Sequence, residues 1–368
     1  MRVLLVGGRS GGHIYALVAV AAHLRARDAA CPLLFVGEKG RMEEDFVPRA
    51  GYDLRVLDMP PASGPAWRRA LSLPRWWSLY RQSAAIIREF APDVVLGSGG
   101  QVCLPVLMAA KRAGLPTLLL EPNAIPGWAN RLTSRYAQPD IVGLLLPEAA
   151  DKWPTGQRVA MTGYPLRPEI LDTTRAEGIA ELGLDPDRRT LLVFGGSQGS
   201  GHLNEVLTTW LPTCDAAWAD GWQVLHLGGW INAKGLDANI TPRLPYHYLP
   251  YLHEMEQALA AADLVLGRAG ATSMAELTAL GLPAVLVPLE GLADNHQVHN
   301  ARWMADAGAA ELLLDSQLTP ERLGQVLDSL CGDPARLVAM ADASAALGMP
   351  DSAERVVALL DELAEGRR

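Results

Sequence analysis

Two glycine-rich segments of this chain have the composition of anion-binding turns, and each directly follows a short apolar run. Gly7–His13 follows Val3–Val6, and Gly195–Gly199 follows Leu191–Phe194. A strand that passes through a glycine-rich turn into a helix leaves backbone N–H groups at the helix N-terminus, where they bind phosphate or another anionic group. The pattern therefore predicts an anion site near the start of each half. The first segment has neither the Lys-Ser/Thr pair of a P-loop nor a dinucleotide fingerprint, so an ordinary tight turn is the alternative.

His13 is the candidate general base. It stands where the helix after the first glycine-rich turn is expected to begin, and the helix dipole at that end lowers the pKa of an imidazole. A neutral histidine beside a cleft can accept a proton from a substrate hydroxyl. The alternative is a histidine that only caps the helix.

A further motif in the second half, Gly267–Glu276, follows the strand candidate Leu264–Leu266. Thr272 or Ser273 is predicted to cap the helix that opens there. The carboxylate of Glu276 comes one turn later and can accept two hydrogen bonds from a ribose diol. The alternative is an acidic side chain that only complements the helix dipole.

The segment Ala293–Asn300 is dense in amide and imidazole groups, which suit sugar hydroxyls. A metal site built from Asp294, His296 and His299 is the less favoured alternative, because no further cluster of ligands is evident. The Asp-Pro-Asp stretch at Asp185–Asp187 is interpreted as a rigid proline turn. We therefore predict neither an essential metal nor another cofactor.

A basic, tryptophan-rich stretch, Trp67–Phe90, lies within an acidic chain. It predicts contact with an anionic membrane surface, because cationic side chains and interfacial tryptophans favour that location. The alternative is an ordinary amphipathic helix with a solvated arginine face. Its arginines are Arg68, Arg69, Arg75, Arg81 and Arg88, and its tryptophans are Trp67, Trp76 and Trp77.

Composition narrows the class of protein. With 368 residues, 49% of them hydrophobic, the chain is long enough for two globular domains. The formal net charge of −9 argues against a nucleic-acid partner. The four cysteines form no CxxC motif and favour a reducing compartment. The N-terminal apolar run is too short for a signal peptide, and no apolar run is long enough to span a bilayer.

Short apolar runs alternate with helical patterns in both halves, which predicts parallel strands joined by crossover helices. Helices are expected at Leu17–Arg27, Val102–Arg112 and Asp351–Glu365, and an interdomain linker from Gly163 to Arg189. The predicted strands are Val3–Val6, Leu33–Val36, Leu54–Leu57, Val94–Leu96, Thr117–Leu120 and Ile141–Leu145, then Thr190–Phe194, Val224–Leu227, Tyr246–Leu249, Leu264–Leu266, Ala284–Val287 and Ala310–Leu313.

Together the motifs resemble the MurG family of peripheral membrane glycosyltransferases, and the match runs over nearly the whole chain. The resemblance implies an α/β GT-B fold, in which two Rossmann-like domains with parallel sheets face an interdomain cleft. It implies an N-terminal acceptor- and membrane-binding domain at 1–163, joined by the C-terminal helix at 350–366, and a UDP-sugar-binding domain at 164–349. The matching motifs are Gly7–His13, Arg41–Glu43, Pro92–Gly97, Glu121 with Asn123, Gly163–Arg167, Gly195–Gly199, Gly270–Glu276 and Asp294–Asn300.

The activity that the resemblance implies is inverting transfer of N-acetylglucosamine from UDP-GlcNAc to the C4 hydroxyl of undecaprenyl-pyrophosphoryl-MurNAc-pentapeptide, in peptidoglycan synthesis. His13 would be catalytic, and the acceptor side would comprise Gly11, Gly12, Glu121 and Asn123. The donor set matched to the family is Ser10, Gly11, Gly12, Asn123, Arg167, Ser197, Leu252, Ala271, Thr272, Glu276, His296, Gln297 and Asn300. In it, Glu276 holds the ribose, Leu252 meets uracil through its backbone, and Arg167 and Ser197 lie near the diphosphate.

The resemblance also implies a place at the cytoplasmic face of the bacterial cell membrane, with Arg75, Trp76 and Trp77 in contact with anionic lipid and other cell-wall enzymes as possible partners. Two alternatives stay open: a GT-B transferase for another lipid or natural-product acceptor, and a non-catalytic nucleotide-sugar-binding protein. Departures from the family pattern are Arg9 in place of threonine, Gln101 in place of tyrosine, Leu120 and Pro122 in place of histidine and glutamine, and His296 in place of glutamine.

Overall fold

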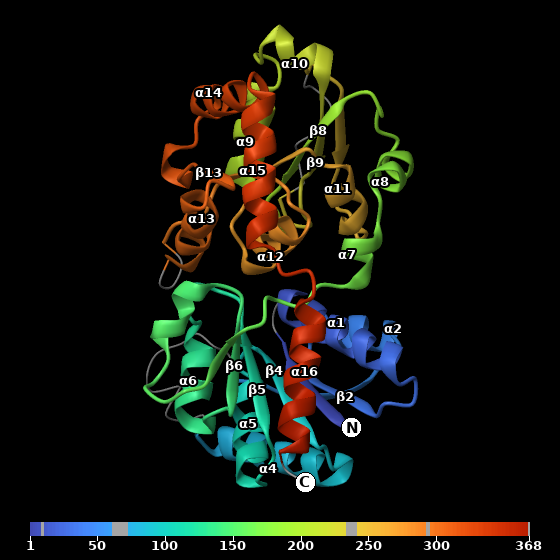
Figure 1. Cartoon of the computed structure of the whole chain (residues 1–368), viewed down its shortest axis with the longest axis vertical. Helices are drawn as coiled ribbons and strands as arrows, with labels where there is room; N and C mark the ends of the chain where they lie inside the picture. The colour runs from blue at the N-terminus through green and yellow to red at the C-terminus, as the bar shows by residue number, and fades with distance from the viewer. Residues whose placement is uncertain (9–10, 61–72, 233–240, 292–294, 367–368) are drawn as a thin grey trace. The chain divides into compact units, whose positions relative to one another are not determined.

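The computed structural model describes residues 1–8, 11–60, 73–232, 241–291 and 295–366. The chain divides into two compact units (Figure 1). Unit 1 comprises Met1–Arg167 and Pro350–Arg368, and unit 2 comprises Pro168–Met349.

Unit 1 is built on a seven-stranded sheet in the order β3-β2-β1-β4-β5-β6-β7. All its strand pairs are parallel. The central strands are buried throughout and read as continuous apolar runs, because helices cover both faces of the sheet. The strands are β1 (Val3–Gly7), β2 (Leu33–Glu38), β3 (Asp53–Leu57), β4 (Val94–Gly99), β5 (Thr117–Glu121), β6 (Ile141–Leu144) and β7 (Val159–Met161).

Helices pack on both faces of this sheet (Figure 1). Leu4 and Val6 of β1 share one apolar cluster with residues of α4 and α5, while α1 packs against the C-terminal helix α16. Two ion pairs, Arg27–Asp361 and Arg158–Glu362, also join α16 to unit 1. The helices are α1 (Gly11–Arg27), α2 (Glu43–Arg49), α4 (Leu73–Phe90), α5 (Cys103–Arg112), α6 (Trp128–Ala137), the 3₁₀ helix η1 (Pro147–Lys152) and α16 (Ser352–Glu365).

Unit 2 contains a six-stranded sheet in the order β10-β9-β8-β11-β12-β13, and its strand pairs are again parallel. Trp210, Trp218 and Trp222 pack in its main core cluster. The strands are β8 (Arg189–Phe194), β9 (Trp222–Leu227), β10 (Tyr246–Leu249), β11 (Leu264–Gly267), β12 (Ala284–Leu286) and β13 (Ala310–Leu312).

The helices of unit 2 also flank its sheet (Figure 1). The expectation of a linker from Gly163 to Arg189 is wrong beyond Arg167, because the chain then forms α7 and α8, and α8 packs on α11. The helices are α7 (Pro168–Asp172), α8 (Arg175–Leu182), α9 (Gly201–Trp210), α10 (Ala216–Gly221), α11 (Met255–Ala261), α12 (Ala271–Ala279), α13 (His296–Asp306), the 3₁₀ helix η3 (Asp315–Gln317), α14 (Pro320–Cys331) and α15 (Pro334–Leu347).

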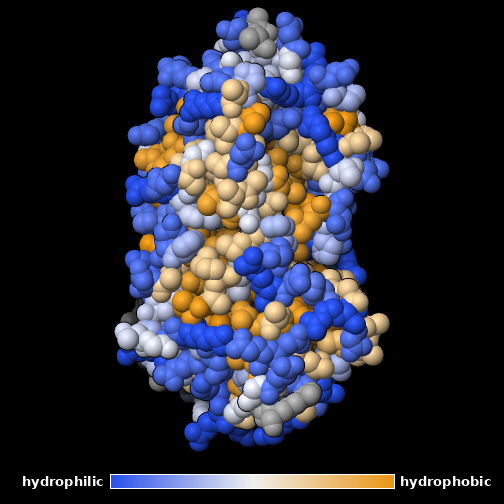
Figure 2. Space-filling model, viewed as in Figure 1, coloured by the Kyte–Doolittle hydropathy of each residue, from blue (hydrophilic) through white to orange (hydrophobic). Residues whose placement is uncertain are grey.

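The predicted α/β architecture with two parallel sheets is confirmed. Each predicted strand is present, with ends that differ by a few residues, and the short strand β7 was not predicted. The predicted cap of α12 is wrong: Gly270 is the N-cap, and no side chain caps that end. Figure 2 shows hydrophilic residues over much of one face of the chain together with broad areas of hydrophobic residues, although most of the large apolar side chains are buried in the two cores.

Candidate active site

The glycine-rich turn of unit 1 lies at the carboxyl edge of its sheet. β1 pairs with β4, and β4 pairs with β5, so the segments that follow Gly7, Gly99 and Glu121 leave the sheet side by side. In open parallel α/β sheets this edge is where ligands bind. The sequence-predicted residues Gly11, Gly12, His13, Glu121 and Asn123 all belong to these segments, whereas Ser10, with Arg9, lies outside the described residues.

The imidazole of His13, in the first turn of α1, is packed directly against the main chain of β4, the strand that pairs with β1. Gly99 has a φ of 119°, and a Cβ atom at that position would lie 2.5 Å from His13 Cε1. Desolvation lowers the pKa of His13 to about 4, although a hydrogen bond with the Ser98 backbone opposes the shift. The ring is therefore neutral near pH 7, in the protonation state that a general base requires.

Glu121, at the end of β5, is 1% exposed and accepts hydrogen bonds through both carboxylate oxygens. Oε1 accepts from Asn123 N at 3.0 Å and from Asn123 Nδ2 at 2.9 Å. Oε2 accepts from Gly127 N at 3.1 Å and from Asn130 Nδ2 at 2.9 Å. Burial raises the pKa of Glu121, and these donors oppose the shift. The carboxylate therefore fixes the loop from β5 to α6, and the half-buried Asn123 is one of the groups that it positions.

The glycine-rich turn of unit 2 lies at the carboxyl edge of the second sheet, where β8 pairs with β11 and β11 with β12. Ser197 is exposed in this turn, and its carbonyl accepts a hydrogen bond from Trp230 N at 3.0 Å. Ser200 then caps α9 by accepting from Leu203 N. Hydrogen bonds thus hold the turn at Ser197 and at Ser200, and α9 begins directly after Ser200.

Arg268, a residue that the sequence analysis did not single out, connects three parts of this edge. It is 8% exposed and donates to Ser200 Oγ at 2.6 Å and to the Val287 carbonyl at 3.0 Å. It also pairs with Asp315 at 2.6 Å. The Arg268 guanidinium therefore fixes the distances between the ends of β11 and β12 and the N-cap of α9. The available sequence signal was a charged residue directly after a buried strand, at the start of a glycine-rich motif.

The start of α12 lies beside this turn because β11 and β8 are neighbours. Ala271 and Thr272 are the first two residues of the helix, and Glu276 is half-buried in its second turn. The buried Asn300 donates from Nδ2 to the Ala269 carbonyl at 3.2 Å. That contact fixes α13 against the segment that leads into α12.

Three further predicted donor residues lie in unit 2, and one lies in unit 1. Gln297 Oε1 accepts from Leu289 N at 2.9 Å, while His296 begins α13 and is half-buried. Leu252 follows the end of β10 by three residues. Arg167 belongs to unit 1, where its guanidinium lies 5.1 Å from the Tyr15 ring centroid. Asp294 lies outside the described residues.

The described part of the predicted membrane stretch is helix α4. Trp77 is 63% exposed and stacks on Tyr80, whereas Trp76 packs against the core. Arg75 pairs with Asp58 at 2.9 Å. Residues 67–72 lie outside the described part of the chain. A groove beside α4 is lined by Trp76, Trp77, Tyr80, Leu104, Pro105, Met108, Lys111, Arg112 and Tyr136.

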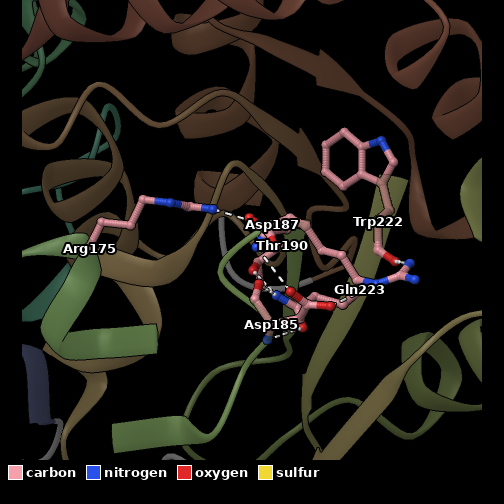
Figure 3. A network of polar contacts seen from close by, with 7 residues as sticks. Arg175, Asp185, Asp187, Thr190, Trp222 and Gln223 are labelled. Atoms are coloured by element: carbon pink, nitrogen blue, oxygen red, sulfur yellow. Dashed lines mark hydrogen bonds and ion pairs between the residues drawn. The ribbon is translucent and has the colours of Figure 1, made fainter. Parts of the chain in front are cut away.

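The Asp-Pro-Asp stretch forms a turn, as predicted, at the opposite edge of the unit 2 sheet (Figure 3). Asp185 Oδ1 accepts from Asp187 N, and Oδ2 accepts from Arg188 Nε. Gln223 accepts from the Asp185 N–H and donates to the Asp185 carbonyl, each at 2.9 Å.

Within the described residues, no group of three or more His, Cys, Asp or Glu side chains could hold a metal ion. No helix in the same residues is long and apolar enough to cross a membrane.

Comparison with known proteins identifies the class of protein to which this chain belongs. Residues 3–139 match the glycosyltransferase family 28 N-terminal domain, and residues 190–356 match the glycosyltransferase family 28 C-terminal domain. The fold is shared by the glycosyltransferase of kitacinnamycin (18% identity, TM-score 0.70, 98% and 99% of the two chains) and by the UDP-GlcNAc 2-epimerase of Neisseria meningitidis (13%, TM-score 0.69, 98% and 100%). The chain is a GT-B glycosyltransferase.

Full-length relatives define the family. The chain is 37% identical to the UDP-N-acetylglucosamine–N-acetylmuramyl-(pentapeptide) pyrophosphoryl-undecaprenol N-acetylglucosamine transferase of Desulforamulus reducens, over 99% of both sequences. It is 39% identical to the protein of the same name from Desulforudis audaxviator, again over 99% of both. The crystal structure of Acinetobacter baumannii MurG matches with a TM-score of 0.76 at 26% identity, covering 98% of this chain and 100% of that one. The chain belongs to the MurG family.

Proposed function

We propose that this protein transfers N-acetylglucosamine from UDP-GlcNAc to the C4 hydroxyl of the muramoyl sugar in undecaprenyl-pyrophosphoryl-MurNAc-pentapeptide, with inversion at the anomeric carbon. The observation that carries the proposal is the identity of 37–39%, over 99% of each sequence, with transferases named for that donor and acceptor. The two carboxyl-edge turns supply the chemistry, because they offer a neutral base and backbone donors for phosphate.

In this proposal unit 1 activates the acceptor. The unprotonated ring of His13 accepts the proton of the C4 hydroxyl as its oxygen attacks the anomeric carbon. Gly11 and Gly12 contribute N–H groups of the first turn of α1, which favour an anionic group near that helix end. Glu121 keeps Asn123 in place through two hydrogen bonds, and Asn123 is the polar group that we expect to face the sugars.

Unit 2 holds the donor and stabilises the leaving UDP. The turn with Ser197 and the first residues of α12, Ala271 and Thr272, direct N–H groups and a helix dipole at the diphosphate, which gains negative charge as the bond breaks. Glu276 binds the ribose diol, and the Leu252 backbone meets uracil. His296 and Gln297 are the residues expected beside the donor sugar, and the buried Asn300 supports them by fixing α13. The family resemblance assigns Arg167, a residue of unit 1, to the diphosphate. No metal takes part in this scheme.

An acceptor panel tests the proposal. Purified protein is incubated with UDP-GlcNAc and, in parallel, with the muramoyl-pentapeptide lipid, with an unrelated polyprenyl-phosphate lipid, with a natural-product aglycone, or without acceptor. UDP release and sugar transfer are measured together. Transfer only to the muramoyl lipid supports the proposal. Transfer to another acceptor assigns a different GT-B activity, and a donor that is bound but never turned over assigns a binding protein.

Glu276→Ala is expected to weaken UDP binding by about tenfold or more, because charge-assisted hydrogen bonds to the ribose are worth roughly 1.5–3 kcal/mol. Isothermal calorimetry of UDP measures the effect. The matched control is Glu205→Ala, which removes a carboxylate from the neighbouring helix α9 and should leave the affinity unchanged. Wild-type affinity in a folded Glu276→Ala variant would remove Glu276 from the donor site.

The proposed location is the cytoplasmic face of the cell membrane, with the α4 groove as the contact. Trp77, an exposed residue, lines the groove together with the cation of Arg112, whereas the neighbouring Lys111 is paired with Asp140. Tryptophan favours the membrane interface, and each basic residue near an anionic surface contributes about 1 kcal/mol. Arg75 has part of its charge balanced by Asp58, and Trp76 is needed by the core, so Trp77 and Arg112 are the sharper probes.

The double variant Trp77→Ser, Arg112→Gln is expected to reduce binding to phosphatidylglycerol-containing vesicles by about tenfold or more, from the lost interfacial and cationic contributions. It should raise KM for a long-chain lipid acceptor while leaving kcat on a short-chain acceptor near wild type. Trp230→Ser is the control for vesicle binding, because Trp230 is 69% exposed but lies in unit 2. Equal losses on both acceptors would contradict the membrane assignment.

A further inference from the structure

Tyr164 is a buried residue that the sequence analysis did not assign, and its phenol reaches the predicted base. The side chain is 2% exposed. Its hydroxyl donates to the Gly12 carbonyl at 3.3 Å and lies 3.5 Å from His13 Nδ1. Because Gly12 and His13 are consecutive, the phenol contacts the first turn of α1 at both its main chain and its reactive side chain.

The two contacts together constrain the proton on the imidazole. A phenol has one proton to donate, whereas a carbonyl oxygen can only accept. If the phenol proton goes to the Gly12 carbonyl, the contact with His13 is satisfied only when Nδ1 carries a proton and donates it to the phenol oxygen. A neutral imidazole protonated at Nδ1 has its lone pair on Nε2. The ring also donates to the Ser98 backbone, and when Nδ1 carries the proton for both contacts, Nε2 is the nitrogen that accepts the substrate proton.

Tyr164 is itself fixed at the place where the chain passes between the units. Its carbonyl accepts from Ser352 Oγ at 3.1 Å, and Ser352 is fully buried at the start of α16. Unit 1 ends at Arg167 and resumes at Pro350, so one hydrogen bond joins the outgoing and the returning segments. The His13 ring also packs against Gly99. The imidazole is therefore in contact with Gly99 and with a phenol whose own backbone is anchored.

We propose that Tyr164 is a positioning residue that keeps His13 in the Nδ1-protonated tautomer and so presents Nε2 as the base. The importance of this contact for turnover rests on the proposed function, whereas the tautomer itself can be measured without substrate. Desolvation lowers the pKa of His13, which agrees with a neutral ring whose two nitrogens have different roles.

The test is Tyr164→Phe, which keeps the buried ring and removes only the hydroxyl. Long-range ¹H–¹⁵N spectra of histidine-labelled protein report the tautomer, with the His13 signals assigned by their loss in His13→Gln. The wild type should show a protonated Nδ1 and an unprotonated Nε2, and Tyr164→Phe should show a mixture. The variant should lower kcat by about ten- to thirtyfold, the size of one lost hydrogen bond to the base. KM for UDP-GlcNAc should not change.

Tyr52→Phe removes a phenol elsewhere in unit 1 and should keep both the His13 spectrum and kcat. Thermal melting confirms that each variant is folded. An Nε2-protonated His13 in the wild type would overturn the proposal even if Tyr164→Phe did not fold, and so would an unchanged tautomer in a folded Tyr164→Phe. A wild-type protein that shows the expected tautomer but no transfer would refute the proposed function and leave the contact established.

Discussion

Replacing His13 with alanine is expected to lower kcat by about 10²–10⁴-fold, the contribution of a positioned general base. The variant loses the group that accepts the proton of the attacking hydroxyl, while the donor-binding residues of unit 2 are unchanged. The affinity for UDP should therefore stay close to wild type. Single-turnover kinetics with saturating donor, together with calorimetry of UDP, separate the two effects.

His23→Ala is the matched control for this variant, because His23 lies on the same helix α1 further from its N-terminus. It should retain wild-type kcat and UDP affinity. If His13→Ala weakened UDP binding while turnover of bound donor survived, His13 would be a donor-site or structural residue. The assignment of unit 1 to acceptor activation would then lose its main chemical argument.

Glu121→Ala is expected to destabilise unit 1 by about 3 kcal/mol or more, since each donor left buried and unpaired costs roughly 1–3 kcal/mol. Four hydrogen bonds converge on this carboxylate, from Asn123, Gly127 and Asn130. The loop that carries Asn123 would lose its support, so kcat should fall as well. Urea denaturation, monitored by hydrogen exchange over residues 117–137, measures the loss of stability in unit 1.

Glu148→Ala is the control for this prediction, because Glu148 is an exposed carboxylate on η1 in the same unit. It should leave stability and activity unchanged. An unaltered free energy of unfolding in Glu121→Ala, combined with a large rise in KM for the acceptor, would contradict the loop-fixing role. Glu121 would then contact the acceptor directly.

The sequence was most informative where one short segment determines its own structure. The segments around Gly7–His13 and Gly195–Gly199 combine an apolar strand, glycines and a helix start in consecutive residues, so the succession of strand and helix could be predicted locally. The parallel topology followed from the alternation of strand and helix patterns. The strand β7 was missed because three residues are too few for a periodic signal. The cap of α12 was misassigned because Thr272 and Ser273 already lie inside the helix.

The contacts that shape the candidate site join residues far apart in the chain, and local patterns do not encode them. Arg268 reaches Ser200 and Asp315 only after β8 and β11 have paired. Tyr164 reaches His13 across 151 positions. Glu121 was predicted as an acceptor-side residue, but its motif gave no sign that both oxygens would be occupied by its own loop. The roles of the predicted donor and acceptor residues therefore remain predictions for the variants above.

Analysis of the product formed from UDP-GlcNAc and the undecaprenyl-pyrophosphoryl-MurNAc-pentapeptide acceptor tests the central claim most directly. Mass spectrometry should find the acceptor heavier by one N-acetylhexosamine residue, with one UDP released for each sugar transferred. Proton NMR of the released disaccharide should show a β-glycosidic bond to the C4 oxygen, because a single displacement on the α-linked donor inverts the anomeric carbon. An α-linked product, attachment at another hydroxyl, or release of UDP with free N-acetylglucosamine in place of transfer would contradict the account.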